Sequence, residues 1–519
     1  MSRYLAGVDV GTSGARCSVF DLDGKRVASA GFEYGADYPQ PGWVEQDAGR
    51  ILARTMEACR AAVAKAQIDA REIASIGISG QRSVTCAIDQ QGTCVRPLIS
   101  WQDARTARQV EQLRGLVDEA EYYRTNGLPL GTTWILTKLL WMRENEPEIF
   151  RRTSRFVQNA DLILKAFGAD EYYTDIGSMA FYGTWDVRRL AWNEPLLARL
   201  GLSAKQFGLP TPAGTQVSTI SPAAASLTGF AVGTPLCVGA GDQNSSVVGM
   251  GAIRAGQGTV TLGTAGLAIL CTEQPAAGFG GMMVTNHAAP GRWEVEGLSG
   301  AAASSLRWLR DVLSSSEHEG AIAGGAGSYQ ALDQLAARVP AGSNGLLFLP
   351  YLATAASPRW NPDARGVFLG LSLSHGRGEL ARAVMEGVAL EIRDIMEQWH
   401  AVGMKVDLMR LGGGATRSRL WCQIQADVYG RPVELLECDD STALGSALLG
   451  GVGSGVFVSI EEGVRAMVHR ASTIEPDPTR HALYDELYRA YVKTYEGLHA
   501  AGAFAAMARL QAATTPNPR

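Results

Sequence analysis

The sequence predicts an α/β fold made of two similar domains that face each other across a cleft. Strand-like and helix-like segments alternate along the 519 residues, a length that exceeds the roughly 100 to 200 residues of one typical domain. A glycine turn between two apolar strands, VDVGTSGARCSVFD, is followed 252 residues later by a second one, VTLGTAGLAILCT. Because each copy opens one half of the chain, we expect domains at residues 1–250 and 251–519.

The composition favours a folded protein that binds neither nucleic acid nor membranes. Hydrophobic residues make up 46% of the chain, which is enough apolar surface to offset the entropy lost on folding. The net charge of -5 comes without a basic block that could neutralise a phosphate backbone. No apolar run approaches the length of a membrane span, and the N-terminus lacks the pattern of a signal peptide. We therefore expect a soluble, cytoplasmic protein.

The first half is expected to open with a three-stranded antiparallel meander. The turns GTSG and DLDG separate three apolar segments over residues 4–32. Apolar residues then recur at helical spacing over residues 48–66, before the strand IASIGISG. Residues 104–167 have a mainly helical pattern, and PLCVGA is a strand that leads through a polar turn into a helix. This order is typical of an α/β layer.

The second half repeats the order of strand and helix after its own glycine hairpin. ELARAVMEGVALEIRDIMEQW predicts an amphipathic helix, MRLGG a strand and RSRLWCQIQADVYG a helix. RPVELLE and STALGSALLGGVG predict a further strand and helix. The pattern DELYRAYVKTYEGLHAAGAFAAMARL predicts a last helical segment.

The turn from Asp9 to Gly14, DVGTSG, has the residue types that a phosphate-binding loop needs. Its glycines let the backbone approach a ligand, its N–H groups and hydroxyls can bind oxygen atoms, and Asp9 could hold magnesium through water. The turn lacks the pattern GxxxxGK[ST] and is therefore not a Walker loop. A plain β-hairpin is the alternative interpretation.

Two further segments could lie at the mouth of the cleft. Asp242 follows the strand PLCVGA and precedes a helix, so it could be a general base or merely the N-cap of that helix. Residues 412–414 are three glycines between a strand and a helix, which could receive a purine or a phosphate or simply form a tight connection.

The segments QRS at residues 81–83 and WQDAR at residues 101–105 follow apolar strands. Together they supply an aromatic face, amides, a carboxylate and a guanidinium, which suit a ligand with many hydroxyl groups. A surface ion pair beside a half-buried tryptophan is the alternative. The eight cysteines show no CxxC spacing and the seven histidines form no metal-spaced pair, which disfavours zinc or histidine-based chemistry.

Taken together, these segments resemble the FGGY family of carbohydrate kinases along nearly the whole chain. The matching motifs include DVGTSGARCSVFDLDG, PGWVEQDA, GISGQRSVTCAID, WQDART, GDQNSSVVGMG, LGTAG, GVFLGLSLSHGRGELARAVMEG and LGGGATRSRLWCQIQADVYGRPV. The resemblance implies two ribonuclease-H-like domains of the actin, hexokinase and Hsp70 ATPase superfamily. It also implies sugar binding mainly by the first domain, ATP binding mainly by the second, and closure of both around the ligands.

The resemblance also implies roles for individual residues. Asp242 is expected to be the general base, and Asp9 and Asp242 are expected beside Mg²⁺. The sugar-side positions are Gln81, Arg82, Trp101, Asp103 and Gln243. The positions on the ATP side are Gly11, Thr12, Ser13, Arg16, Gly263, Thr264, Gly412, Gly413 and Gly414. A homodimer is possible because dimers are common in the family.

The substrate position differs from both well-known patterns of the family. Xylulokinases carry Met-His after the glutamine that Gln81 matches, and glycerol kinases carry Arg-Glu, whereas this chain has Arg82 and Ser83. Thr133 stands where glycerol kinases have a tyrosine. Loss of that carboxylate and phenol favours a ketopentose such as xylulose over glycerol or a tetritol of the erythritol type, with an acidic sugar ranked lower. Non-catalytic alternatives are a sugar or nucleotide sensor of the same superfamily and a nucleotide-independent sugar-binding protein; a nucleotide-independent isomerase is also conceivable.

Overall fold

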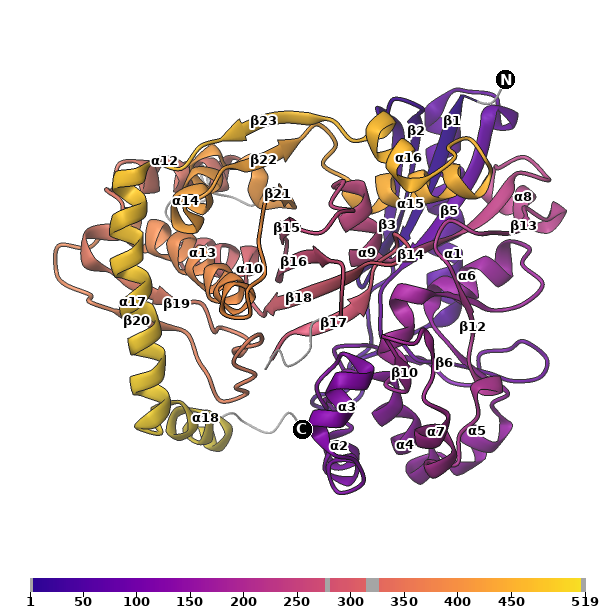
Figure 1. The fold of residues 1–519 in the computed structure, drawn as a ribbon, viewed down its shortest axis with the longest axis horizontal. Coiled ribbons are helices and arrows are strands. Elements are labelled where there is room, and N and C mark those ends of the chain that lie inside the picture. The colour runs from indigo at the N-terminus through magenta and orange to yellow at the C-terminus, as the bar shows by residue number, and fades with distance from the viewer. Residues whose placement is uncertain (1–2, 276–280, 314–325, 515–519) are drawn as a thin grey trace.

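A computed structural model describes residues 3–275, 281–313 and 326–514. It has two lobes, each built on one large mixed sheet with helices on its faces (Figure 1). The indigo N-terminal strands lie in one lobe, and most of the orange and yellow second half of the chain forms the other. Within the described ranges, no helix is both long and apolar enough to cross a bilayer.

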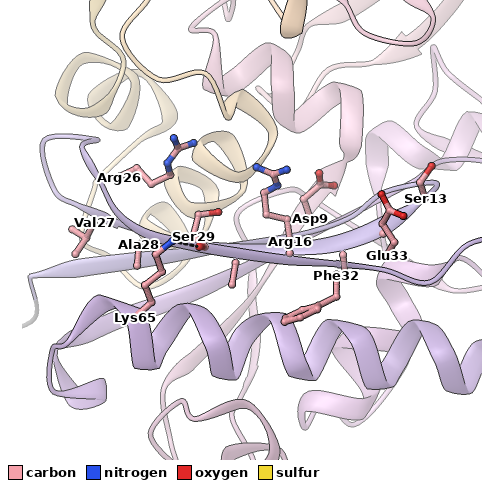
Figure 2. Close-up of a pocket in the computed structure, with 14 residues that line it drawn as sticks. Asp9, Ser13, Arg16, Arg26, Val27, Ala28, Ser29, Phe32, Glu33 and Lys65 are labelled. Carbon is pink, nitrogen blue, oxygen red and sulfur yellow. Dashed lines mark hydrogen bonds between the residues drawn. The ribbon is translucent and has the colours of Figure 1, made fainter. Parts of the chain in front are cut away.

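The first lobe contains the antiparallel meander that the sequence predicts. β1 pairs with β2 and β2 with β3, whereas β5 runs parallel to β1 and β14 runs parallel to β5. In sheet order the strands are β13 (Gln216–Thr219), β14 (Pro235–Gly241), β5 (Ile73–Gly80), β1 (Tyr4–Val10), β2 (Gly14–Asp21) and β3 (Arg26–Glu33). The helix predicted at residues 48–66 is confirmed as α1 (Ala48–Ala66), which lies along β2 and β3 (Figure 2).

A mainly helical region extends the first lobe away from this sheet, as the pattern of residues 104–167 predicts. Its helices are α2 (Ala107–Arg114), α3 (Glu119–Asn126), α4 (Ile135–Asn145), α5 (Pro147–Arg152) and α7 (Glu194–Arg199). Two further helices stay on the sheet side of the lobe: α6 (Asn159–Phe167) packs against β5 and β14, and α8 (Pro222–Thr228) packs against α1. Short two-stranded pairs connect them: β4 (Glu45–Gln46) with β7 (Leu98–Ile99), β6 (Cys86–Ile88) with β8 (Arg155–Val157), β9 (Tyr173–Asp175) with β12 (Leu209–Thr211), and β10 (Trp185–Asp186) with β11 (Ala191–Trp192). An apolar cluster that includes Trp134 and Phe181 fills the space between these elements.

The second lobe is built on a seven-stranded sheet. In sheet order its strands are β17 (Met283–Asn286), β18 (Trp293–Ser299), β16 (Gly266–Thr272), β15 (Gln257–Leu262), β21 (Leu408–Gly412), β22 (Val433–Leu436) and β23 (Arg470–Ile474). The flanking elements are α10 (Ala303–Leu313), α12 (Ala326–Ala337), α13 (Arg377–Ala401), α14 (Arg419–Tyr429) and the pair β19 (Leu347–Leu349) and β20 (Val367–Leu369).

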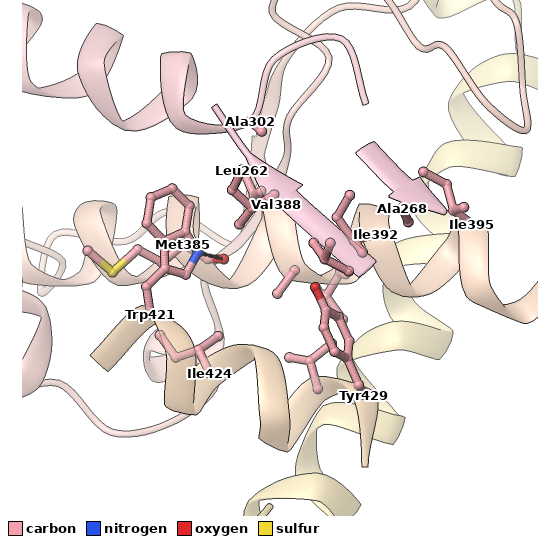
Figure 3. Packing of buried hydrophobic residues seen from close by; sticks show 14 of the residues in the cluster. Leu262, Ala268, Ala302, Met385, Val388, Ile392, Ile395, Trp421, Ile424 and Tyr429 are labelled. Carbon is pink, nitrogen blue, oxygen red and sulfur yellow. Dashed lines mark hydrogen bonds between the residues drawn. The ribbon is translucent and has the colours of Figure 1, made fainter. Parts of the chain in front are cut away.

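The core of the second lobe lies directly behind its glycine turn. Leu262, the last residue of β15, packs in the same buried cluster as Met385 of α13 and Trp421 of α14 (Figure 3). The indole of Trp421 donates a hydrogen bond of 3.0 Å to the Met385 carbonyl, which ties α14 to α13. The turn that follows Leu262 therefore starts from a firmly packed position.

One helix from the second half of the chain completes the first lobe. α15 (Ser441–Gly453) packs against β1, β5, β14 and α9 (Asp242–Gly249), and α16 (Ile460–Met467) packs against α15 (Figure 1). The approach is so close that a Cβ on Gly445 would lie 1.8 Å from the carbonyl oxygen of Ser245. α15 thus belongs to the second half of the sequence but packs in the first lobe. The division of the chain into domains at residues 1–250 and 251–519 stays a prediction.

The last predicted helical segment consists of two helices in the structure. α17 (Pro478–Ala500) ends where the backbone of Gly502 takes a φ of 69°, and α18 (Ala503–Thr514) starts after it. A left-handed residue interrupts the helical hydrogen bonds, and glycine adopts this conformation at little cost.

Candidate active site

The two glycine turns line one cavity between the lobes. Thr12 comes from the turn between β1 and β2, and Gly263 and Thr264 come from the turn between β15 and β16. The carboxylate of Asp242 and the guanidinium of Arg82 lie on the same cavity, whose volume is about 270 Å³. The two turns that the sequence places in different halves therefore meet at one carboxylate.

The first glycine turn is held from behind by three side chains that bond its carbonyl oxygens. The Asn159 amide donates to the Val10 carbonyl over 2.8 Å, and the Tyr34 hydroxyl donates to the Gly11 carbonyl. The Gln46 amide donates to the carbonyl of Thr12 over 2.7 Å. The N–H groups of Thr12 and Ser13 have no acceptor among the described residues, so they remain available to an anionic oxygen.

In the second glycine turn, too, the carbonyl oxygens accept hydrogen bonds, here from backbone N–H groups. The N–H of Ala303, at the start of α10, donates to the Gly263 carbonyl over 2.9 Å, and the N–H of Ala302 donates to the Thr264 carbonyl over 3.1 Å. The N–H of Thr264 has no acceptor in the part of the chain that the structure describes. In both turns, therefore, carbonyl oxygens are bonded within the protein, whereas N–H groups remain available to a phosphate.

Asp9 has the surroundings expected of a residue beside a divalent cation. It lies at the end of β1, and its Oδ1 atom is shielded from solvent without a hydrogen-bond partner among the described residues. Burial and the nearby carboxylates of Asp242 and Asp440 raise the pKa of Asp9 well above its usual value. A bound cation would relieve this repulsion and occupy the free oxygen.

The carboxylates at this site fit Mg²⁺ better than a metal ion whose ligands all come from the protein. Within the described ranges, no point is surrounded by three or more acidic, histidine or cysteine side chains. Magnesium usually takes one or two carboxylates and fills its other positions with water and phosphate oxygens. Asp9 and Asp242 would supply the carboxylates.

Asp242 does not cap its helix, and it lines the cavity between the lobes. It is the first residue of α9, and the preceding Gly241 occupies the cap position without a side-chain bond to the helix. The carboxylate accepts a 2.8 Å hydrogen bond from the N–H of Gln243, and its Oδ1 atom lies 3.6 Å from Nε of Arg82. Burial raises the pKa of Asp242, while the Arg82 charge opposes that rise. The N-cap alternative is therefore wrong for this residue.

Arg82 reaches across the cavity to a carboxylate in the other lobe. Its two terminal nitrogens donate to both oxygens of Glu296 on β18, over 2.8 and 2.6 Å. The guanidinium also stacks on Phe181, 4.6 Å from the ring centre. Sequence reasoning missed Glu296, although the pattern WEVEG, with acids two residues apart in an apolar strand, puts Glu294 and Glu296 on one face.

The expected sugar-side residues divide into two groups. Arg82, Trp101 and Gln243 line the cavity, and the Trp101 indole also donates to the Thr12 hydroxyl over 2.9 Å. Gln81 and Asp103 are buried and do not line it.

Both residues outside the cavity have structural partners. Gln81 donates to the side chain of Gln46 over 2.8 Å and so supports the first glycine turn. The Asp103 carboxylate accepts from the N–H of Val44 and from the guanidinium of Arg105. The placement of these two residues differs from the expectation because their side chains turn toward partners in distant segments.

A second, more open cavity of about 750 Å³ begins beside Asp9 and follows β2 and β3 (Figure 2). Ser13 and Arg16 line it, and Figure 2 shows Arg16 and Asp9 on the same side of the strands. Arg16 is half-exposed, and its Nη1 atom lies 3.9 Å from Oδ2 of Asp440. The guanidinium could therefore bind a further anion. This placement suits a phosphate that extends from the first glycine turn.

The three glycines of the second lobe are not equivalent. Gly412 and Gly413 line a small cavity of about 150 Å³, and Gly414 does not. Gly413 has a φ of 84°, and a Cβ there would lie 2.5 Å from the Leu262 carbonyl. The structure thus requires glycine at this position for close packing, whether or not a nucleoside binds beside it.

Comparison with known proteins decides the family. Residues 4–249 match the N-terminal domain of the FGGY family of carbohydrate kinases, and residues 258–454 match its C-terminal domain. The chain belongs to the FGGY family. It is a carbohydrate kinase, which transfers a phosphoryl group to an alcohol, and kinases of this family use ATP.

The relatives within the FGGY family carry several substrate names. A glycerol kinase of Citrifermentans bemidjiense is 31% identical over 88% of this chain and 91% of its own. A gluconokinase of Bacillus subtilis is 29% identical over 89% of this chain and 90% of its own. These names cannot fix one substrate for this chain.

Solved structures confirm the predicted architecture. A xylulose kinase from Rhodospirillum rubrum has a TM-score of 0.86 and 29% identity, and covers 96% of this chain and 99% of its own. A Plasmodium falciparum glycerol kinase, solved with ADP, shares the fold with a TM-score of 0.83 and 19% identity, over 95% of this chain and 98% of its own. The prediction of two domains of the actin and hexokinase type is confirmed.

Proposed function

We propose that this FGGY kinase transfers the γ-phosphoryl group of ATP, bound with Mg²⁺, to a hydroxyl of a ketopentose such as xylulose. One observation carries the proposal. The Asp242 carboxylate lies on the same cavity as both glycine turns, whose free N–H groups come from different lobes. A sugar hydroxyl beside Asp242 would therefore face a phosphate held between the turns.

The residues divide the reaction between them. The sugar oxygen forms a bond to the γ-phosphorus while the bond from that phosphorus to the ADP oxygen breaks, and the hydroxyl proton passes to Asp242. A raised pKa makes the Asp242 carboxylate a better proton acceptor, and the charge of the adjacent Arg82 favours its ionised form. The N–H groups of Thr12, Ser13 and Thr264 stabilise the charge on the phosphoryl oxygens.

Magnesium completes the charge balance at this site. Asp9, with its unpaired Oδ1 atom, and Asp242 are the residues that would hold it. When bound, the ion supplies neutralisation of the phosphate charge. Arg16, which lines the open cavity along β2 and β3, would also neutralise phosphate charge.

The cavity supports a ketopentose over glycerol. Trp101 and Gln243 offer a flat face and an amide, and Oε1 of Gln243 lacks a partner among the residues that the structure covers. Ser83 and Thr133 line the same space with small side chains, which leaves room for a ligand longer than a triol. A tetritol of the erythritol type is the second candidate, because Arg82 matches the glycerol-kinase pattern and the relatives include a glycerol kinase.

An assay of ADP release across pentuloses, tetritols, glycerol and hexuloses tests the proposal. We expect the highest kcat/KM with a pentulose and almost no ADP release without sugar. ADP release at the same rate with and without every sugar would identify a nucleotide switch and overturn the proposal. A cytoplasmic location and a homodimer remain predictions that fractionation and light scattering can check.

A further inference from the structure

Arg82 is the only cationic side chain among the described residues that line the site cavity, and its charge is already engaged. Both terminal nitrogens donate to Glu296, and Nη1 also reaches the side-chain oxygen of Asn244 over 3.4 Å. The remaining edge, Nε, faces Asp242 at 3.6 Å. The side chains of Arg82 and Glu296 are 9% and 1% exposed, so water screens this pair little.

The acidic groups around the cavity outnumber this one cation. Asp242 and Glu296 both line it, and Arg82 is shared between them. A ligand carboxylate would lose its hydration on entry and would meet two carboxylates without a free cation. An uncharged hydroxyl could instead accept from Arg82 or donate to Asp242 at little cost.

We propose that Glu296 determines substrate specificity through Arg82: by pairing with the guanidinium, it makes the cavity select uncharged sugars and polyols over aldonates of the same length. The inference rests on the proposed function and narrows its substrate class. It separates this chain from its gluconokinase relative, although Arg82 alone would suggest a site for an acidic sugar.

Matched ligand pairs test the inference on the unmodified protein. The pairs are xylulose with xylonate, erythritol with erythronate, glycerol with glycerate, and glucitol with gluconate. Calorimetry with a saturating non-hydrolysable ATP analogue and magnesium measures each affinity. In every pair that binds, we expect the neutral ligand to bind at least about 100-fold more tightly. Equal or tighter binding of the aldonates, or no binding by any of the eight ligands, would overturn the inference.

A pair of variants on one strand links the selectivity to Glu296. Glu296→Gln removes the charge that engages Arg82, so we expect the neutral-to-aldonate ratio to fall by about tenfold or more. Glu294→Gln is the control, because Glu294 is equally buried on β18 but bonds Asn244 and not Arg82. Burial and the neighbouring Glu296 raise the pKa of Glu294 to about 8, which favours the neutral acid that glutamine resembles. The control should leave the ratio within about threefold of wild type.

The outcomes separate this inference from the proposed function. If both variants lose selectivity, or if neither does, the selectivity does not depend on Glu296 and the inference is overturned. The proposed function survives this outcome as long as kinase activity persists. If the neutral ligands bind preferentially but none supports ADP release, the proposed function fails and the inferred selectivity stands. If Glu296→Gln does not fold, the wild-type comparison still tests the predicted selectivity for uncharged ligands.

Discussion

Tyr34 supports the first glycine turn without reaching the substrate. Its hydroxyl donates to the Gly11 carbonyl, and the side chain is 6% exposed. Together with Asn159 and Gln46, it holds three carbonyl oxygens of the turn in hydrogen bonds within the protein. The affinity for ATP should therefore depend on side chains that the nucleotide never contacts.

Tyr34→Phe tests this dependence. The variant leaves a partly buried carbonyl without its donor, a change that costs about 0.5 to 1.5 kcal/mol. We expect the KM for ATP to rise by about tenfold while the KM for the sugar changes by less than about threefold. Steady-state kinetics measures both, and Tyr38→Phe is the matched control because Tyr38 is 73% exposed. An unchanged KM for ATP would show that the turn keeps its shape without Tyr34.

Single residues also show what a sequence can and cannot predict about the site. Arg82, Trp101 and Asp242 reach the cavity as expected because each follows a strand that ends there. Gln81 also follows a strand, but its amide turns to Gln46, which lies 35 residues earlier in the chain. A motif specifies the residue type, whereas tertiary partners set the direction of the side chain.

The contact between α9 and α15 shows how glycines bring elements from the two halves together. A Cβ on Gly445 of α15 would lie 1.8 Å from the Ser245 carbonyl of α9, and one on Gly249 of α9 would lie 1.9 Å from the Ser441 carbonyl. Each helix therefore has a glycine where the other backbone passes. Since Asp242 opens α9, this contact also positions the base.

Gly445→Ala should disturb this contact. The added methyl group meets a backbone oxygen that cannot rotate away, so we expect the free energy of unfolding to fall by about 1 to 3 kcal/mol. Gly497→Ala in α17 is the control, because nothing lies within 4 Å of its Cβ position. There alanine should raise helix stability by about 0.5 to 1 kcal/mol. Urea unfolding measures both, and equal changes would contradict the close packing.

The contact between α13 and β18 should make stability depend on pH. Glu391 of α13 accepts from the Ser299 hydroxyl, and burial raises the pKa of Glu391 to about 8. A carboxyl whose pKa is raised in the folded state stabilises the protein fully below its unfolded pKa, and this contribution is lost as the pH rises through about 8.

Glu391→Gln removes this titration. The free energy of unfolding of wild type should therefore fall relative to that of the variant as the pH rises from 5 to 8. Urea unfolding at four pH values measures the difference, with Glu486→Gln as the control at an exposed position. Parallel curves for wild type and Glu391→Gln would show that Glu391 does not titrate in this range.

Patterns along the chain predicted several elements well. The spacing of apolar residues gave the bounds of α1, and the paired turns predicted the hairpins β1–β2 and β15–β16. The break between α17 and α18 was missed, because an isolated glycine in a helical pattern is compatible with a continuous helix until its φ is known.

At the scale of the whole molecule, the repeated turn predicted two facing lobes, and the family and the solved structures confirm them. The crossing of α15 to the first lobe could not be predicted, because alternating strands and helices do not reveal which sheet a helix covers. The lobes also contact each other directly, for example through the 2.7 Å bond from the Val284 N–H to the Gly127 carbonyl. Closure of the lobes around bound ligands would exclude water during transfer.

The central claim is that one carboxylate between the two lobes accepts the proton of the sugar hydroxyl. Asp242→Asn tests it most directly, because the amide keeps the shape of the side chain and cannot accept a proton. Measured by sugar-dependent ADP release, turnover should fall by about 100- to 10,000-fold, while the thermal shift with magnesium ATP stays close to that of wild type. Turnover near the wild-type rate in a folded variant that binds ATP would contradict the account.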